Sequence, residues 1–119
     1  MKSKRPEIQN IVNSNTKEKE RFQNTVLRPI LKQQHLILVD SFQAHLKQQK
    51  MNFENLTDTL KEKNIDALFS KDIAFKNKQI GMILGRFTRE EFLQYNKFSS
   101  HYNRRILQML RKRIKDTFL

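Results

Sequence analysis

The sequence predicts an all-α protein, a bundle of about four long helices with room for a short helix at the N-terminus. The 119 residues include only two Gly and two Pro, whereas sandwiches, barrels and nucleotide-binding folds need glycine at their tight turns. Lys, Gln, Glu, Leu and Arg are abundant, and all five favour helix. Finally, residues Phe87–Phe92 contain all the residues of an N-terminal helix-capping motif, and neither Gly nor Pro follows before Leu119.

This helix start defines the last helix. Thr88 can accept the backbone N–H of Glu91, and the Glu91 carboxylate can accept the N–H of Thr88, which together make a capping box. Phe87 and Phe92 flank the cap at the positions of a hydrophobic staple. We therefore expect one helix over residues 89–117. Its buried face would consist of Phe92, Tyr95, Tyr102, Ile106, Met109, Leu110 and Ile114.

The N-terminal residues 1–16 are polar and contain Pro6, so we expect an arm or a short helix before a single helical domain of residues 17–119. Proline is tolerated in the first turn of a helix, which allows a short helix over residues 6–12. Residues 13–16 read Asn-Ser-Asn-Thr, a composition typical of a connector or a helix cap.

Residues 17–50 form a long helical segment that Pro29 interrupts. A proline inside a helix kinks it or begins a new one, and we expect the break or kink near residues 24–28. At about 100° per residue one apolar stripe follows the segment. It consists of Leu27, Leu31, Leu38, Phe42 and Leu46. A second stripe of Ile30, Ile37 and Ala44 indicates packing against more than one neighbour.

Two further helices are expected between these segments, over residues 52–63 and 65–87. The first would begin near Asn52 and bury Phe53, Leu56 and Leu60. The second would bury a large apolar stripe of Phe69, Ile73, Ile80, Leu84 and Phe87. Three more apolar residues lie outside that stripe and predict surplus apolar surface: Leu68, Phe75 and Met82.

A run of small residues lies about a quarter-turn from the large stripe of residues 65–87. It consists of Ala67, Ala74, Gly81 and Gly85. A glycine inside a helix costs about 1 kcal/mol relative to alanine, so we expect a neighbouring helix packed very close to compensate. Gly81 and Gly85 also match the small-xxx-small pattern of tight helix crossings, a pattern defined in membranes.

Four segments of the chain resemble a family of small, uncharacterised bacterial all-helical proteins. They are Phe22–Lys32, Lys71–Asn77, Gly81–Thr88 and Asn103–Ile106, and the resemblance extends over nearly the whole chain from Lys4. Members of this family sometimes carry the automatic label glyoxalase. The residues do not support that label, because glyoxalase-type enzymes are mixed α/β proteins that hold a metal with paired His and Glu on sheets. The resemblance implies an all-helical domain and no functional residue.

The sequence offers no catalytic or metal-binding pattern, so we expect neither an enzyme nor a cofactor. There is no Cys, which removes thiolate metal sites and Cys nucleophiles. The three histidines, His35, His45 and His101, lack the Glu-x-x-His pattern of di-iron bundles and the i, i+4 spacing of zinc pairs. We expect His35 to be a core residue on the apolar stripe. The sequence leaves open whether histidines of different helices meet in the fold.

The charge of the chain is the strongest functional signal. The net charge is +12, from 24 Lys and Arg against 12 Asp and Glu, and its densest part is the C-terminal quarter. One face of the last helix collects five candidate nucleic-acid-binding residues: Arg104, Arg105, Arg111, Lys112 and Lys115. They could follow a phosphate backbone without reading sequence. Alternatively, the face is a solvated surface, since Tyr95 and Tyr102 point to the core and not to bases.

The function that we expect is that of a structural or interaction protein, self-associating as a homodimer that covers the surplus apolar residues. The alternatives are binding of nucleic acid or another acidic partner, or adsorption of a basic amphipathic helix to an anionic membrane. The longest aliphatic run, Leu36–Val39, is far too short to span a membrane. The N-terminus has no apolar segment typical of a secretory signal. We therefore expect a cytoplasmic protein.

Overall fold

The computed structural model describes residues 14–119, and it confirms the all-α class. Of these residues 87% are helical, in six helices, and none is in a strand. The predicted helix over residues 6–12 lies outside the described residues. The described part has six helices and not the expected four or so. Breaks at Gln34, Asp72 and Phe98 fall inside three of the expected helical segments, and one observed helix, over residues 58–71, combines parts of two of them.

The first helix runs over residues 14–33 and contains a wider π-helical turn, η1 (Gln23–Leu27), followed by α2 (Arg28–Gln33). The expected connector is therefore wrong for residues 14–16. The π turn falls where a kink was predicted, and Pro29 explains it. The proline ring clashes with the carbonyl four residues earlier, and a π turn shifts the preceding bonds to i→i−5, as in the Arg28 N–H that bonds to the Gln23 carbonyl. The chain leaves helical geometry only at Gln34 (φ −92°, ψ 7°).

Helix α3 (His35–Gln48) is followed by a 3₁₀ turn, η2 (Phe53–Asn55), and by α4 (Asp58–Lys71). The expected helix start at Asn52 is wrong. Instead, the Thr57 hydroxyl accepts the N–H of Leu60 at 3.3 Å and caps α4. Only the short η2 turn forms in the first part of the predicted helix.

The expected helix over residues 65–87 is broken at Asp72 (φ −87°, ψ 95°), which separates α4 from α5 (Ile73–Leu84). The Asp72 carboxylate accepts the N–H of Phe75 at 3.0 Å and so caps the new helix. The break changes which face is buried. Ile73, expected in the core, is 68% exposed, whereas Phe75, Gln79 and Ile83 are buried.

The expected last helix is also divided, into α6 (Arg89–Lys97) and α7 (Ser99–Phe118), by Phe98 (φ −140°, ψ 47°). The capping box is confirmed, with Thr88 N–H to Glu91 at 2.8 Å and Glu91 N–H to the Thr88 hydroxyl at 3.2 Å. The staple takes a different form, because the rings of Phe87 and Phe92 both contact Tyr95, at centroid distances of 5.7 and 5.9 Å.

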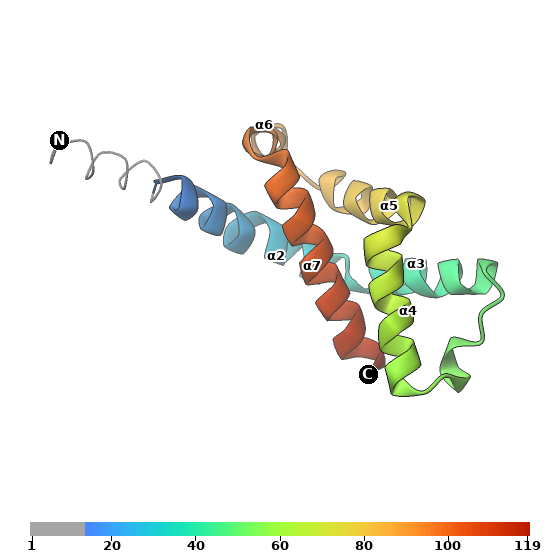
Figure 1. Ribbon diagram of the computed structural model, residues 1–119. Helices are drawn as coiled ribbons and strands as arrows, with labels where there is room; N and C mark the ends of the chain where they lie inside the picture. The colour runs from blue at the N-terminus through green and yellow to red at the C-terminus, as the bar shows by residue number, and fades with distance from the viewer. Residues whose placement is uncertain (1–13) are drawn as a thin grey trace, which may run out of the picture.

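Helix α7 is the centre of the fold, with the first helix along one side and α4 along another (Figure 1). The first helix runs parallel to α7, because Glu18 pairs with Lys97 at one end and His35 contacts Arg113 at the other. Helix α4 runs antiparallel, since Glu62 near its start pairs with Lys115 near the end of α7. Within residues 14–119, no helix combines the length and apolar character that crossing a membrane requires.

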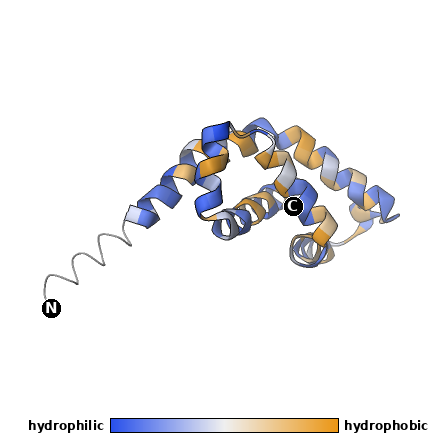
Figure 2. Cartoon of the chain, turned by 90° about the horizontal axis from the view of Figure 1, so that it is seen from above, coloured by the Kyte–Doolittle hydropathy of each residue, from blue (hydrophilic) through white to orange (hydrophobic). Residues whose placement is uncertain are grey.

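The core lies between these helices and takes buried apolar residues from each of them. Figure 2 shows hydrophobic residues (orange) alternating with hydrophilic ones (blue) along the helices. All five members of the predicted stripe on residues 17–50 are buried: Leu27, Leu31, Leu38, Phe42 and Leu46. On α7, four of the predicted residues are buried at regular four-residue intervals: Tyr102, Ile106, Leu110 and Ile114. The second predicted stripe is mostly wrong, because Ile30 is buried but Ile37 and Ala44 are exposed.

Candidate functional site

The five predicted basic residues all lie on α7, but they divide into two groups according to their partners. Arg111 and Lys115 face α4. Lys115 Nζ lies 2.8 Å from Asp66 and 3.3 Å from Glu62, and Arg111 lies 3.8 Å from Asp66. The contact with Asp66, more than that with Glu62, raises the pKa of Lys115 above its ordinary value. These two residues therefore join α7 to α4, Lys115 through two short contacts and Arg111 through a longer one that leaves its side chain 41% exposed.

Arg105 belongs to the other group, which faces the first helix. Its Nε donates to the side-chain carbonyl of Gln23 at 3.1 Å, and its Nη1 donates to that of Gln108 at 2.8 Å. Both acceptors are uncharged amides. The guanidinium is therefore held in place while its positive charge stays uncompensated by these partners.

Two arginines that the sequence did not single out are also held by uncharged side chains. Arg28 Nε donates to the side-chain oxygen of Asn24 at 3.0 Å, and Arg113 Nη1 lies 3.4 Å from Nδ1 of His35. Arginine has no acceptor, so Nδ1 of His35 accepts this bond. His35 is thus half-buried and bonded to Arg113, and not the core residue that was expected.

A cleft of about 370 Å³ opens between α2 and α7 beside these arginines. Its lining residues are Arg28, Leu31, His35, Met109, Lys112, Arg113, Asp116 and Thr117. Lys112, one of the five predicted residues, therefore lines this cleft together with its neighbour Arg113 and with Arg28 of the first helix. We call this line of contact between the first helix and α7 the seam, and its basic residues are Arg28, Arg105, Lys112 and Arg113.

At the other end of the helix pair, His101 lies in a positive environment. Its Nε2 is 3.2 Å from the side-chain nitrogen of Gln23. Burial lowers the pKa of His101 below its ordinary value, and the nearby charges of Lys19, Arg104 and Arg105 lower it further. Arg104, the last of the five predicted residues, is exposed here.

The histidines do not meet in the fold. His45 lies at the end of α3, where its Nε2 is 3.0 Å from Asp72 and its ring packs on Phe75 at 4.9 Å. Asp72 thus caps α5 and contacts α3 at the same time. Within residues 14–119, no three His, Asp or Glu side chains come together in a way that could hold a metal ion.

The small-residue run does not pack against another helix of the described chain. Ala67, Ala74, Gly81 and Gly85 are all exposed, and a Cβ built on Gly81 has nothing within 4 Å. The physical reason is the break at Asp72, which puts Ala67 and Ala74 on different helices. Part of the predicted apolar surplus also disappears, because Leu68 and Phe75 are buried within the chain and Met82 is half-buried.

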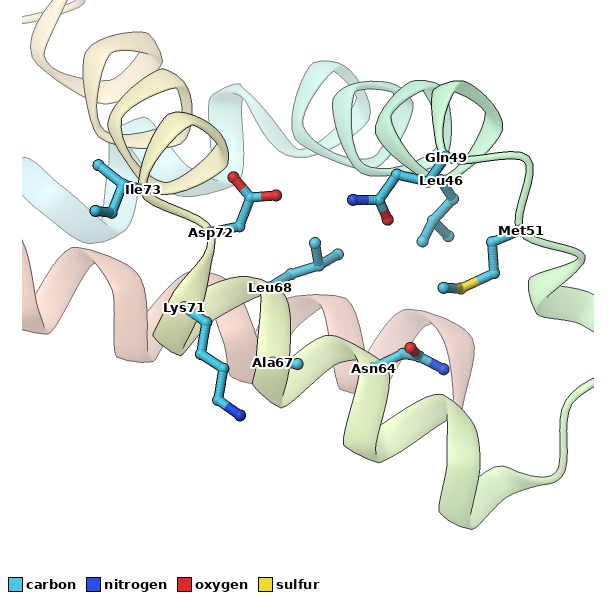
Figure 3. A pocket seen from close by; sticks show the side chains of 9 residues that line it. All are labelled: Leu46, Gln49, Met51, Asn64, Ala67, Leu68, Lys71, Asp72 and Ile73. Atoms are coloured by element: carbon cyan, nitrogen blue, oxygen red, sulfur yellow. The ribbon is translucent and has the colours of Figure 1, made fainter.

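A second cleft, of about 520 Å³, lies between the end of α3, α4 and the start of α5 (Figure 3). Leu46 and Leu68 point toward one another across it, and the Asp72 carboxylate lies at its edge. Its lining residues are Leu46, Gln49, Met51, Asn64, Ala67, Leu68, Lys71, Asp72 and Ile73. Its lining includes no Ser, Thr, Cys or His side chain.

The outer face of α3 is apolar and carries little charge. Leu36 is 76% exposed and Ile37 is 52% exposed, and Ala44 is exposed further along the helix. Residues 33–46 contain no Lys or Arg, and Asp40 is their single acidic residue. Lys47, exposed near the end of the helix, is the cation of α3.

Comparison of the chain with models of protein families, with curated proteins and with solved structures finds no match. The resemblance to small bacterial helical proteins therefore stays a prediction.

Proposed function

We propose that this chain is a non-enzymatic helical interaction protein of the cytoplasm that forms a homodimer through the outer face of α3. The observation that carries this proposal is the exposure of two adjacent large aliphatic side chains, Leu36 and Ile37, on the stretch of residues 33–46 that has no Lys or Arg. Covering such side chains removes apolar surface from water, which favours association.

The charge distribution explains why this face suits a second copy. Two chains of net charge +12 repel one another, and the repulsion is weaker at a face where cations are sparse, as here, where Lys47 at the end of α3 is the cation of the helix. A homodimer brings the same face of both copies together around a two-fold axis. With the axis near Asp40, Ile37 of one copy lies over the small Ala44 of the second copy.

Sedimentation velocity over a micromolar concentration series tests the homodimer. We expect the Ile37→Glu variant to shift the protein to monomer, because a buried unpaired charge is costly. The matched control is Leu93→Glu, which changes an equally exposed leucine (59%) on α6 and should leave the dimer intact. Asp40→Asn should strengthen the dimer by removing the like charge at the axis. A monomeric wild-type protein at high micromolar concentration overturns the proposal.

A second candidate function is nucleic-acid binding, which a different observation favours. Arg28, Arg105 and Arg113 are held by uncharged side chains, whereas Arg111 and Lys115 are held by carboxylates. An electrophoretic mobility shift assay with DNA and RNA at low salt is the direct test. Binding should weaken steeply with added salt, because each neutralised phosphate releases counterions.

A further inference from the structure

We propose that the seam between the first helix and α7 is the groove that binds the phosphodiester backbone, and that it does so through Arg28, Arg105, Lys112 and Arg113. This inference rests on the second candidate function and names its site. It also replaces the face predicted from sequence, since two of those five residues are engaged by α4.

The arginines of the seam are oriented before any ligand arrives. Arg28 uses Nε for Asn24, and Arg113 uses Nη1 for His35, so other N–H groups of each guanidinium remain for a ligand. A planar guanidinium can donate two parallel hydrogen bonds to a phosphate. Because its uncharged partners already fix the side chain, less conformational entropy is lost on binding.

The charge of the seam is only partly offset within the described residues. The ion pairs that join described side chains involve Glu18, Glu62, Asp66 and Asp72, and none of these pairs includes a basic residue of the seam. Asp116 is the acidic residue that lines the cleft, beside three cations. A cleft with this excess attracts anions and repels other cations.

The length of the seam fits a strand better than a single anion. Arg105 and Lys112 are seven residues apart on α7, a distance of about 10 Å along a helix. That is longer than a single phosphate group, and along the axis of a B-form duplex it corresponds to about three phosphates of one strand at about 3.4 Å each. Arg28 and Lys112 are also exposed, which suits contact with a backbone that passes over the surface.

The positive electrostatic potential along the helix pair extends to His101, whose pKa can therefore report the binding of an anion. Besides burial, which is the larger cause, Lys19, Arg104 and Arg105 lower the pKa of His101, so a bound phosphate that offsets these charges should raise it. The carboxylate of Glu18 also lies at this end, paired with Lys97 at 3.0 Å. A titration of the His101 ring protons by NMR, with and without ligand, therefore measures occupancy of this end of the seam.

The test compares two triple variants that remove the same charge from different places. Arg28→Gln/Lys112→Gln/Arg113→Gln removes three cations of the seam, and Lys63→Gln/Lys71→Gln/Lys78→Gln removes three exposed lysines of α4 and α5. The probe is a labelled single-stranded oligonucleotide. We expect the seam variant to lose at least about tenfold in affinity and its log–log salt slope to shrink by about 2, at roughly 0.7 per lost phosphate contact. The control should lose much less.

Each other outcome has a defined meaning. If the oligonucleotide binds and both variants weaken it equally, the seam is not the site, although nucleic-acid binding stands. If neither DNA nor RNA binds at low salt, nucleic-acid binding and the seam as its site are both overturned, and the homodimer proposal is unaffected. If inorganic phosphate binds as tightly and displaces the oligonucleotide, the cleft is a small-anion site, and the backbone groove is overturned. Circular dichroism of each variant separates loss of binding from loss of fold, and single substitutions replace any triple variant that unfolds.

Discussion

The side-chain amide of Gln23 lies between Arg105 and His101 and fixes the roles of all three groups. Its oxygen accepts from Arg105 at 3.1 Å, so its nitrogen faces Nε2 of His101 at 3.2 Å. An amide nitrogen only donates, and Nε2 must therefore accept. This contact favours the neutral imidazole with its proton on Nδ1. Burial and the nearby cations favour the neutral form as well, because both lower the pKa of His101.

This relationship predicts that stability falls as the pH decreases through the ordinary histidine range. Because the folded pKa of His101 is lowered from 6.5, the unfolded chain takes up a proton first as the pH falls below that value. Stability then rises with pH and levels off above 6.5. Urea unfolding at several pH values should show this slope, and His101→Gln, which keeps an acceptor for Gln23, should reduce it. An unchanged slope in the variant would contradict the assignment.

The orientation of α3 predicts opposite results for two leucines two positions apart. Leu38 is 1% exposed and Leu36 is 76% exposed. Leu38→Ala removes buried methyl groups and leaves a cavity, which costs about 2–5 kcal/mol. Leu36→Ala should change the unfolding free energy of the monomer by less than about 0.5 kcal/mol. Denaturant unfolding measured in the monomeric Ile37→Glu background compares the two without a contribution from dimerisation.

A third prediction concerns Asp72, whose carboxylate caps α5 and contacts His45. Asp72→Ala removes both, and loss of the cap alone costs about 0.5–2 kcal/mol. Asp72→Asn keeps a side-chain oxygen for the Phe75 N–H and should recover most of the loss in thermal unfolding. If the Asn variant is as unstable as the Ala variant, the contact with His45 and not the cap is the main contribution.

Asp72 also shows how far the sequence could predict this fold. The capping box at Thr88 was predicted because all of its partners lie within four residues. The stripe from Leu27 to Leu46 was predicted because its period follows from the helix itself. Asp72 was placed inside a helix, because the apolar residues on both sides continue a helical period. The break is stabilised by its contact with His45, which is distant in the sequence.

The seam could not be predicted for a similar reason. Arg105 and Lys112 stood out on one helix, but Arg28 belongs to the first helix and Arg113 faces it. Which cations share a groove depends on the parallel pairing of helices that are about eighty residues apart. The ion pair between Lys115 and Asp66 likewise joins two different helices. It could not be predicted from the pattern of residues around a single helix.

The last prediction separates Lys115 from the basic residues of the seam. Lys115→Gln should reduce oligonucleotide binding no more than one exposed control substitution such as Lys63→Gln, because its ammonium group is already paired with Asp66 and Glu62. Its effect should appear in stability. The raised pKa of Lys115 means that its contribution is present below pH 10.5 and decreases as the pH rises through the folded value. Unfolding curves at neutral and alkaline pH should therefore converge for wild type and variant as the lysine loses its proton. A large loss of binding in Lys115→Gln with unchanged stability would return this residue to the ligand site.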